Sequence, residues 1–592
     1  MFTTRPELVG TFGMVSSTHW LASQSGMAVL EAGGNAFDAA VASGLVLQVV
    51  EPHLNGPGGE VPIIAWDSRL TDPFVVCGQG PAPAAATIDV FESMDLASVP
   101  GTGLLPGCVP GAFGAWMLLL RDHGSMRLRD VMRFAIEYAA GGFVMLPQIS
   151  QAIEGVSGIF KEHWRSSRDL WLPHGKAPTA GQLFRNEALA ATYSRILDEA
   201  EAHASDRDEQ IEAARRCFYE GFVAEAIAEF YETELMDVSG TAHAGLLRYE
   251  DLRDWRATVE KPLALDYHGH TVLKAGPWSQ GPVFLQQLAL LDGFDLDEMP
   301  TTSPEFVHTV VECAKLAFAD REAYYGDPDH VDVPMDTLLS TEYAAQRRGA
   351  ITDRAVVSGL HPGSVDGRTP RLPTIDVLGQ VDAGAAIGEP TARTDGGILG
   401  DTCHLDVADR FGNVVAATPS GGWFQGSPAV PNLGFSVTTR GQMFWLDRDL
   451  PNSLAPGKRP RTTLTPSLAL REGKPYLAFG TPGGDMQDQW TLLFFLRHVH
   501  HGMNLQEAID LPAWHTTHFP SSFYPRQAEP GVLHIEDRVG EETLKALRDR
   551  GHVVTVEDSW ALGRISAVSR DRDGVLRAAA NPRGMQGYAT GR

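Results

Sequence analysis

The chain has 592 residues, of which 43% are hydrophobic and 21% charged, and its 48 Lys and Arg against 74 Asp and Glu give a formal net charge of −26. This composition is typical of a large ordered globular protein and excludes the disordered and fibrous classes. The acidic excess repels phosphate backbones and anionic lipid surfaces, so we expect neither nucleic acid nor a membrane among the partners.

The N-terminal residues and the cysteines indicate a reducing compartment. Residues 1–17 have neither a cationic start nor an apolar block of signal-peptide length, and no apolar run approaches the roughly 18 residues of a membrane span. The five cysteines are scattered and form no C-x-x-C pair, which argues against a disulfide framework or a zinc knuckle. The sequence therefore predicts a cytoplasmic protein.

Motifs for the common cofactors and metals are missing from the sequence. There is no G-x-x-x-x-G-K-[ST] loop and no G-x-S-x-G elbow. Histidines gather in RHVHHG and AWHTTH, without an H-E-x-x-H or carboxylate pattern (His498, His500, His501, His515 and His518). We expect neither a metal nor a cofactor.

Two packed helices are predicted between Trp20 and Glu51, separated by a break at Gly33-Gly34-Asn35. The second is rich in Ala and other small residues, so we expect it to be buried against a neighbour at close range. The run HLNGPGGE that follows, residues 53–60, is a glycine loop that forms either a simple turn or a ligand contact.

Further helices are predicted in the middle of the chain. Alternating charges among alanines predict a solvated helical region over residues 189–230. Ser303 and Pro304 are an N-cap and a first-turn proline, and they open a helix with an apolar stripe that runs to Gly326.

The composition changes at residues 378–400, which contain six glycines and few large apolar residues and are predicted to form a mobile surface segment. An alternating strand pattern starts directly afterwards at Thr402 and turns at residues 410–413, which predicts a hairpin. If the Asp401–Thr402 bond were cut, the new α-amino group, with a pKa of about 7.7–8.0, would lie beside the threonine hydroxyl. On this pattern alone, an ordinary hairpin threonine remains the alternative.

Two further segments have the residue types of a binding site. FGTPGGD, residues 479–485, places adjacent glycines between an extended and a helical run, where bare N–H groups form either an oxyanion hole or a simple turn. PGKRPRTT, residues 456–463, has three cations and two hydroxyls, which suit either a bound carboxylate or a loop neutralised by neighbouring acids.

Taken in order, these segments resemble the γ-glutamyltransferase family of N-terminal-nucleophile hydrolases over nearly the whole chain. The matching segments are the N-terminal stretch from GMVSSTHW to NGPGGE, then CVPGAFGAW, FADREAYYGDP, GDTCHLDVADRFGNVVAAT, PGKRPRTTLTPS and FGTPGGD. The resemblance implies an α+β fold, a four-layer αββα sandwich. It also implies cleavage between Asp401 and Thr402 into a large subunit, 1–401, and a small subunit, 402–592, which together form one unit.

The resemblance also implies site residues. Thr402 would be the nucleophile and, through its amine, the general base of an acyl-enzyme mechanism. The oxyanion hole of the family corresponds to Gly483 and Gly484. A hydroxyl residue that bonds the nucleophile corresponds to Ser420. Cys403 replaces the second threonine of the family's T-T-H motif, and strand alternation points it away from the nucleophile face, so we expect it to be structural.

The departures from the family concern the substrate. Gln79 replaces the Arg that binds the glutamyl α-carboxylate, and Gln442 and Met443 replace the two aspartates that hold the α-ammonium. Gly422 stands in place of an Asn near the nucleophile. Thr462 and Thr463 replace two carboxylate-binding serines, and Arg440 could supply a cation from another direction. We therefore expect an acidic acyl group without an α-amino group, as in the branch with glutaryl-type cephalosporin acylases and oxamate amidohydrolase.

The main hypothesis is thus a self-cleaving threonine amidohydrolase or acyltransferase acting on a small acidic amide. The alternatives are a true γ-glutamyl hydrolase or transferase for glutathione-like substrates, and a non-catalytic member. The expected partners are the small-molecule substrate and the two subunits of one precursor, and a homo-oligomer stays open. If PGKRPRTT binds an anionic substrate, Arg461→Ala should raise KM more than it lowers kcat.

Overall fold

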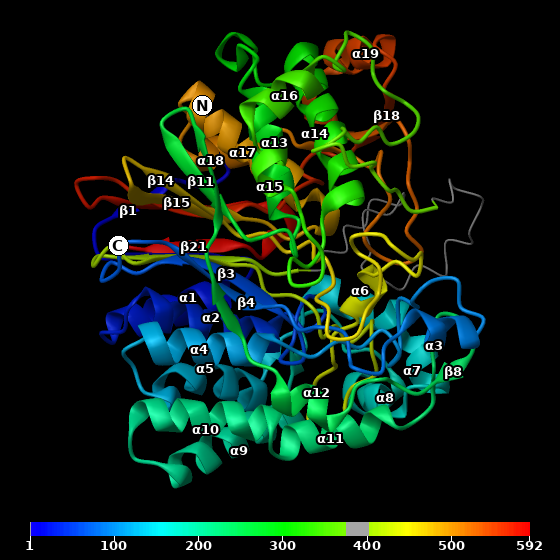
Figure 1. The fold of residues 1–592 in the computed structure, drawn as a ribbon. Coiled ribbons are helices and arrows are strands. Elements are labelled where there is room, and N and C mark those ends of the chain that lie inside the picture. Colours follow the sequence, from blue (N-terminus) through cyan, green and yellow to red (C-terminus); the bar gives the residue numbers. More distant parts are fainter. Residues whose placement is uncertain (1, 375–401) are drawn as a thin grey trace.

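The computed structural model describes residues 2–374 and 402–592, so Asp401 and the predicted mobile segment 378–400 lie outside the described residues. Two large antiparallel sheets lie at the centre (Figure 1). The first has the order β21 (Tyr588–Gly591), β2 (Gly13–Ser17), β12 (Leu405–Asp409), β13 (Val414–Ala417), β3 (Val61–Trp66), β4 (Phe74–Gly78) and β9 (Thr258–Glu260). The second has the order β1 (Leu8–Gly10), β20 (Leu576–Ala580), β19 (Ser566–Arg570), β15 (Lys474–Gly480), β14 (Ser467–Arg471), β11 (His270–Lys274) and β10 (Leu263–Tyr267).

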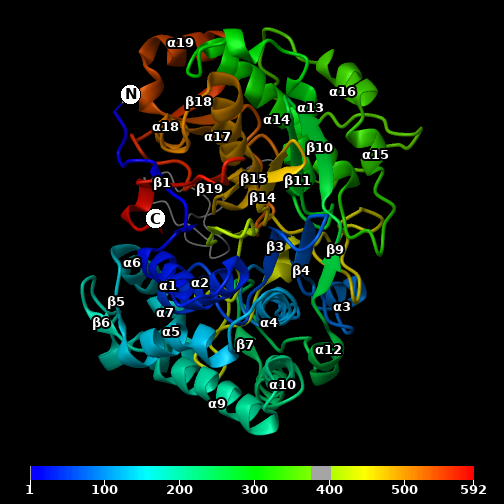
Figure 2. The same cartoon turned by 90° about the vertical axis from the view of Figure 1, so that its left-hand side faces the viewer.

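Helices cover the outer face of each sheet, as Figures 1 and 2 show from two directions. Below the first sheet lie α1 (Trp20–Glu31), α2 (Ala36–Val50), α4 (Ala112–His123), α5 (Leu128–Gly141), α9 (Glu187–His203), α10 (Arg207–Tyr219) and α11 (Phe222–Tyr231). Above the second lie α13 (Gly281–Leu291), α14 (Pro304–Tyr324), α16 (Thr341–Arg348), α17 (Gln487–His501), α18 (Leu505–Asp510) and α19 (Glu541–Asp549). The predicted mixture of helix and sheet is confirmed.

Smaller elements complete the described fold. The short helices are α3 (Ile88–Ser93), α6 (Pro147–Gly155), α7 (Ser157–Glu162), α8 (Arg165–Trp171), α12 (Tyr249–Asp254) and α15 (Met335–Leu338). The short strands are β5 (Phe143–Val144), β6 (Leu183–Phe184), β7 (Leu235–Met236), β8 (Ala242–His243), β16 (Trp514–Thr516), β17 (Val532–Glu536) and β18 (Val553–Glu557). Within the described ranges, no helix is both long and apolar enough to cross a lipid bilayer.

Strand alternation divides the hydrophobic core. On β12, Leu405 and Val407 pack against the helices below, whereas Ala408 lies in the separate cluster between the two sheets. Successive side chains of a strand point to opposite faces, which explains this division. Even-numbered residues of β12 therefore face the second sheet, and odd-numbered residues face the helices.

The predicted helix pair is confirmed as α1 and α2, with Asn35 and Asp38 forming a capping box at the start of α2. Every residue of α2 is buried. A Cβ added at Gly26 of α1 would lie only 2.4 Å from Ser43 Oγ of α2. The small residues therefore let the two helices approach closely, as the sequence predicted.

The other predicted elements are confirmed with one difference. Residues 189–230 form α9, α10 and most of α11, and β12 and β13 form the predicted hairpin around residues 410–413. Helix α14 begins at Pro304 with Ser303 as its cap, but it is buried on nearly all sides rather than along one apolar stripe. Its charged residues Arg321 and Glu322 are buried as well, because they have ionic partners in the interior.

Candidate active site

Residues of four adjacent strand ends form a row on the inner face of the first sheet. Thr402 pairs with Ser420, and Ser420 pairs with Glu60, through isolated β-bridges beyond β12, β13 and β3. The β3–β4 register, with Val61 opposite Gly78, sets Gln79 next to Glu60. Neighbouring strands are about 4.8 Å apart, so three steps separate Thr402 from Gln79 by roughly 14 Å.

The first three members of the row are linked by hydrogen bonds and charge. Thr402 Oγ1 lies 3.2 Å from Ser420 Oγ, and both residues are fully buried. Arg440 Nη2 donates to Ser420 Oγ at 2.6 Å, and Arg440 Nε donates to Glu60 Oε1. Burial raises the pKa of Glu60, while the charge of Arg440 acts in the opposite direction. The hydroxyl of Thr402 is therefore next to a polar chain that ends in a buried ion pair.

The glycine turn lies at the same end of the molecule as Thr402. An added Cβ at Gly480, the last residue of β15, would lie 2.2 Å from His404 Cε1, so the end of β15 directly contacts β12. The chain then turns at Gly483 and Gly484, whose φ angles of 124° and 52° favour glycine. No hydrogen bond among the described residues is donated by either of these two backbone N–H groups. The turn thus has the donors that an oxyanion hole needs.

An ion network fixes the residue after the glycines. Asp485 accepts from Arg321 Nη1 of α14 and from the backbone N–H and hydroxyl of Ser522, the last two at 2.7 and 2.6 Å. Glu322, the next residue of α14, pairs with Arg461 Nη2 at 2.6 Å. The segments FADREAYYGDP, PGKRPRTT and FGTPGGD, far apart in the sequence, therefore meet at one buried network behind the turn.

Sequence reasoning missed a second buried chain of polar groups. His404 lies 2.9 Å from Thr418 Oγ1 through Nδ1 and 2.9 Å from Asp406 Oδ1 through Nε2. Ser566 of β19 donates to the other oxygen of Asp406 at 2.8 Å, which links the two sheets. Thr402, His404 and Asp406 alternate along the sequence, and this alternation could have predicted that their side chains share one face.

The predicted substrate residues are only partly brought together. Arg440 is beside Ser420, but its charge is already paired with Glu60. Gln442 is used elsewhere: its side chain donates to Thr439 Oγ1 and accepts from the backbone N–H of Tyr524, both at 3.1 Å. Gln79 is at the far end of the row.

The two threonines lie beside the second sheet. Thr462 pairs through its backbone with Trp278 and Gln280. The Thr463 hydroxyl is buried and has no hydrogen-bond partner among the described residues. Arg461, which we expected to serve substrate uptake, bonds to Glu322 and to the carbonyl of Arg321 instead. It supports the glycine turn rather than offering a free cation.

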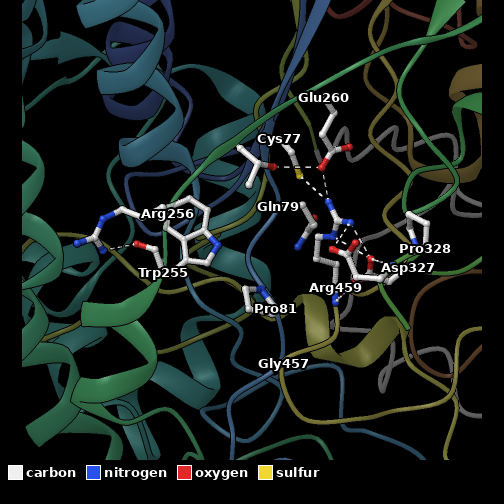
Figure 3. A pocket seen from close by; sticks show the side chains of 12 residues that line it. Cys77, Gln79, Pro81, Trp255, Arg256, Glu260, Asp327, Pro328, Gly457 and Arg459 are labelled. Carbon is white, nitrogen blue, oxygen red and sulfur yellow. Dashed lines mark hydrogen bonds and ion pairs between the residues drawn. The ribbon is translucent and has the colours of Figure 1, made fainter. Parts of the chain in front are cut away.

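A pocket of about 420 Å³ opens at the Gln79 end of the row (Figure 3). It is lined by Cys77, Gln79, Pro81, Trp255, Arg256, Thr258, Glu260, Asp327, Pro328, Asp329, Gly457 and Arg459. Burial raises the pKa of the Cys77 thiol to about 12, which keeps this wall of the pocket neutral.

Cys403 points to the helices, as strand alternation predicted. Its Sγ lies 3.0 Å from Glu51 Oε2 and 3.1 Å from Asn55 Nδ2. Glu51 also accepts from Thr18 at 2.7 Å. Burial raises the pKa of Cys403 far above its ordinary value, which makes it a poor nucleophile.

Within residues 2–374 and 402–592, one group of metal-type ligands is present that the sequence did not single out. Atoms of His308, Glu312 and His552 lie within 4.8 Å of one another. Lys315 Nζ donates to Glu312 at 2.7 Å, and the two histidines bond to each other at 2.9 Å. These groups thus already have partners, and the expected absence of a metal stays a prediction.

Comparison with known proteins identifies the family of the chain. Residues 22–591 match the family model for gamma-glutamyltranspeptidase. The chain is 30% identical to the glutathione hydrolase-like YwrD proenzyme of Bacillus subtilis, with 99% of each chain covered. It is 31% identical to the oxamate amidohydrolase proenzyme of Klebsiella pneumoniae, with 98% of this chain and 99% of that protein covered.

Solved structures of similar proteins match this chain over its full length. The LmbA2991HD structure is 55% identical, with a TM-score of 0.93 and 100% of both chains covered. The cephalosporin acylase of Bacillus halodurans is 29% identical, with a TM-score of 0.83 over 100% of this chain and 97% of that one. The chain belongs to the gamma-glutamyltranspeptidase family.

Proposed function

We propose that the protein is a self-cleaving amide hydrolase whose nucleophile is Thr402. Residues 1–401 and 402–592 would be its large and small subunits, within a four-layer αββα sandwich of the N-terminal-nucleophile type. The observation that carries the proposal is the position of Thr402, buried at the head of β12 with Oγ1 3.2 Å from Ser420 Oγ. The proenzyme names of the two curated relatives support processing.

Processing would begin when Thr402 Oγ1 attacks the carbonyl carbon of Asp401. The peptide C–N bond breaks, an ester forms, and its hydrolysis leaves a carboxylate on Asp401 and an α-amino group on Thr402. This amine has a pKa of about 7.7–8.0 in an unperturbed chain, which suits a general base near neutral pH. One cut thus creates the base beside the nucleophile.

Turnover would use the same atoms. The amine of Thr402 takes the hydroxyl proton as Oγ1 attacks the substrate carbonyl, and then gives that proton to the departing amine. The N–H groups of Gly483 and Gly484 stabilise the tetrahedral oxyanion. Water, activated by the same amine, then hydrolyses the acyl-enzyme and releases the acid.

We further propose that the acyl group is acidic and has no α-amino group. Gln442 and Met443 give no carboxylate for an α-ammonium, and the side chain of Gln442 is held by Thr439 and Tyr524. Arg440 is the buried cation next to Ser420. We expect the guanidinium of Arg440 to attract a substrate carboxylate to the neighbourhood of Ser420.

The first test is the intact mass of the wild-type protein beside Thr402→Ala and Cys403→Ser. Wild type and Cys403→Ser should give two chains, the smaller starting at Thr402, because Cys403 points away from the nucleophile. Thr402→Ala should stay whole. A wild-type chain that remains uncut after prolonged incubation would point to the non-catalytic alternative.

The second test compares the kcat/KM values of amide substrates that share the same leaving group. Glutaryl and oxalyl amides should have higher kcat/KM than the γ-glutamyl amide. The reverse order would favour the γ-glutamyl alternative, in line with the name of the YwrD relative, and would leave the nucleophile assignment intact.

A further inference from the structure

The pocket at the Gln79 end of the row has the size of a ligand site but no assigned ligand. Its volume of about 420 Å³ falls in the range of small-molecule sites. Its walls come from the end of β4, the segment before β9, the loop after α14 and the basic segment 456–463. It therefore lies at the β4–β9 edge of the first sheet.

Acidic groups outnumber cations inside the pocket. Arg459 contacts Asp327 Oδ1 at 2.7 Å, Glu260 Oε1 at 2.6 Å and Asp329 Oδ2 at 3.1 Å. Arg256 is turned away from this group in Figure 3 and donates to Glu220 at 2.8 Å. The lining therefore has three carboxylates against two guanidinium groups, of which only Arg459 contacts them.

The pocket stabilises the charged form of Asp327. Burial by itself would raise the pKa of Asp327, but its hydrogen bonds and charge interaction with Arg459 outweigh burial and hold the pKa below the ordinary value. A negative field in a partly enclosed pocket attracts cations.

Gln79 provides an independent sign that a hydrogen-bond donor is missing. Its Nε2 donates to the carbonyl of Gly80 at 3.0 Å, which fixes the orientation of the amide because only the nitrogen can donate there. Its Oε1 is buried and has no partner among the described residues. A buried acceptor without a donor is costly, and a ligand N–H would satisfy it.

We propose that this pocket is a subsite for an organic ammonium group, which donates to Gln79 Oε1, lies against the face of Trp255 and faces the free side of Asp329. The Trp255 ring forms one wall, and an indole face attracts cations. Asp329 is 79% exposed, so its carboxylate can turn toward a ligand. A compact metal ion fits less well, because Arg459 already uses the oxygens of Asp327 and Glu260.

The ammonium group has two sources, a remote end of the amide substrate or a separate free amine. The pocket is roughly 14 Å from Thr402 by strand spacing, so a substrate would have to extend along the row to reach it. The inference goes beyond the proposed hydrolysis, since the pocket would bind its cation whether or not Thr402 is active.

Calorimetric titration of the purified full-length protein, cleaved or not, with 1,5-diaminopentane tests the proposal, with 1,5-pentanediol and glutarate as uncharged and anionic controls. We expect saturable binding of the diamine alone, at one per chain. Asp329→Asn should weaken it about two- to fivefold, as for one partly exposed ion pair. Gln79→Leu should weaken it at least about tenfold, as for a hydrogen bond to a charged donor.

Asp332→Asn is the matched control, because Asp332 is 84% exposed and pairs with Arg368, which does not line the pocket. It should bind the diamine like wild type. The proposal is overturned if the diamine does not bind, if Asp329→Asn and Asp332→Asn behave alike, or if glutarate binds instead. Diamine binding can be measured on protein that has no amidase activity. A failure of this proposal can therefore be told apart from a failure of the proposed function.

Kinetics then separate the two sources. If the diamine raises the KM of amides that carry a terminal ammonium group and not the KM of their methyl analogues, the ammonium belongs to the substrate. If it binds without changing either KM, the pocket serves a separate amine.

Discussion

Arg440 donates to Ser420 Oγ at 2.6 Å, and this bond determines what Ser420 can do for the nucleophile. A guanidinium has no acceptor atom, so Ser420 must accept from it. The hydroxyl proton of Ser420 can then point to Thr402 Oγ1, 3.2 Å away. Ser420 thus accepts from Arg440 and keeps its own proton, with which it can donate to Thr402 Oγ1.

Ser420→Ala removes this donor. We expect kcat to fall about twofold to tenfold, because a hydrogen bond between uncharged groups contributes roughly 0.5–1.5 kcal/mol, while KM changes little. Self-cleavage should slow as well. Ser436→Ala is the matched control, a buried serine that bonds to the carbonyl of Ser427 instead. Equal kinetic losses in both variants would mean that Ser420 acts only through packing.

Asp485→Asn tests the support of the glycine turn. The change weakens the ion pair with Arg321, and loss of turn geometry should lower kcat by about tenfold or more at nearly constant KM. Asp488→Asn is the control, since Asp488 pairs with Lys274 at 2.8 Å and should affect stability alone. A rise in KM without a change in kcat would assign Asp485 to substrate binding.

Gly480→Ala tests the contact between the two sheets. The new Cβ would meet the His404 ring at 2.2 Å, so one of them must move. We expect about 1–3 kcal/mol of destabilisation in chemical unfolding, typical of overpacking. Gly158→Ala, in α7, meets nothing within 4 Å and should not destabilise. A Gly480 variant as stable as wild type would show that His404 has room to shift.

The stability of the protein should fall at alkaline pH through His534. Burial lowers the pKa of His534, but hydrogen bonds and charge interactions with Glu529 and Glu557 outweigh burial and raise it to about 9. A raised pKa means that the folded state favours the proton. Its stabilisation is therefore complete below the unfolded pKa of about 6.5 and is lost as pH rises to about 9.

The protonated His534 contributes at most about 3 kcal/mol to the free energy of unfolding. Thermal unfolding between pH 6 and pH 10 should show the decline in wild type, with less of it in His534→Asn. If Tm falls with pH by the same amount in both proteins, His534 is not the group responsible.

The sequence by itself identified the nucleophile candidate and the elements that hold it. Hydrophobic alternation and turn residues around residues 410–413 predicted the hairpin that follows Thr402, although its first strand begins at Leu405, and small residues predicted the buried α2. These features depend on local periodicity and on residue volume, which are written in consecutive positions. The ordered motifs added Ser420, Gly483 and Gly484.

Only the tertiary structure decided the roles of the charged residues. The sequence predicted Arg461 and Arg440 as cations available to the substrate. In the structure, Arg461 pairs with Glu322, and Arg440 pairs with Glu60. The partners are 139 and 380 positions away in the chain. A charge in the interior is stable only with an opposite charge next to it, and which charge that is depends on how distant segments pack, which periodicity cannot reveal.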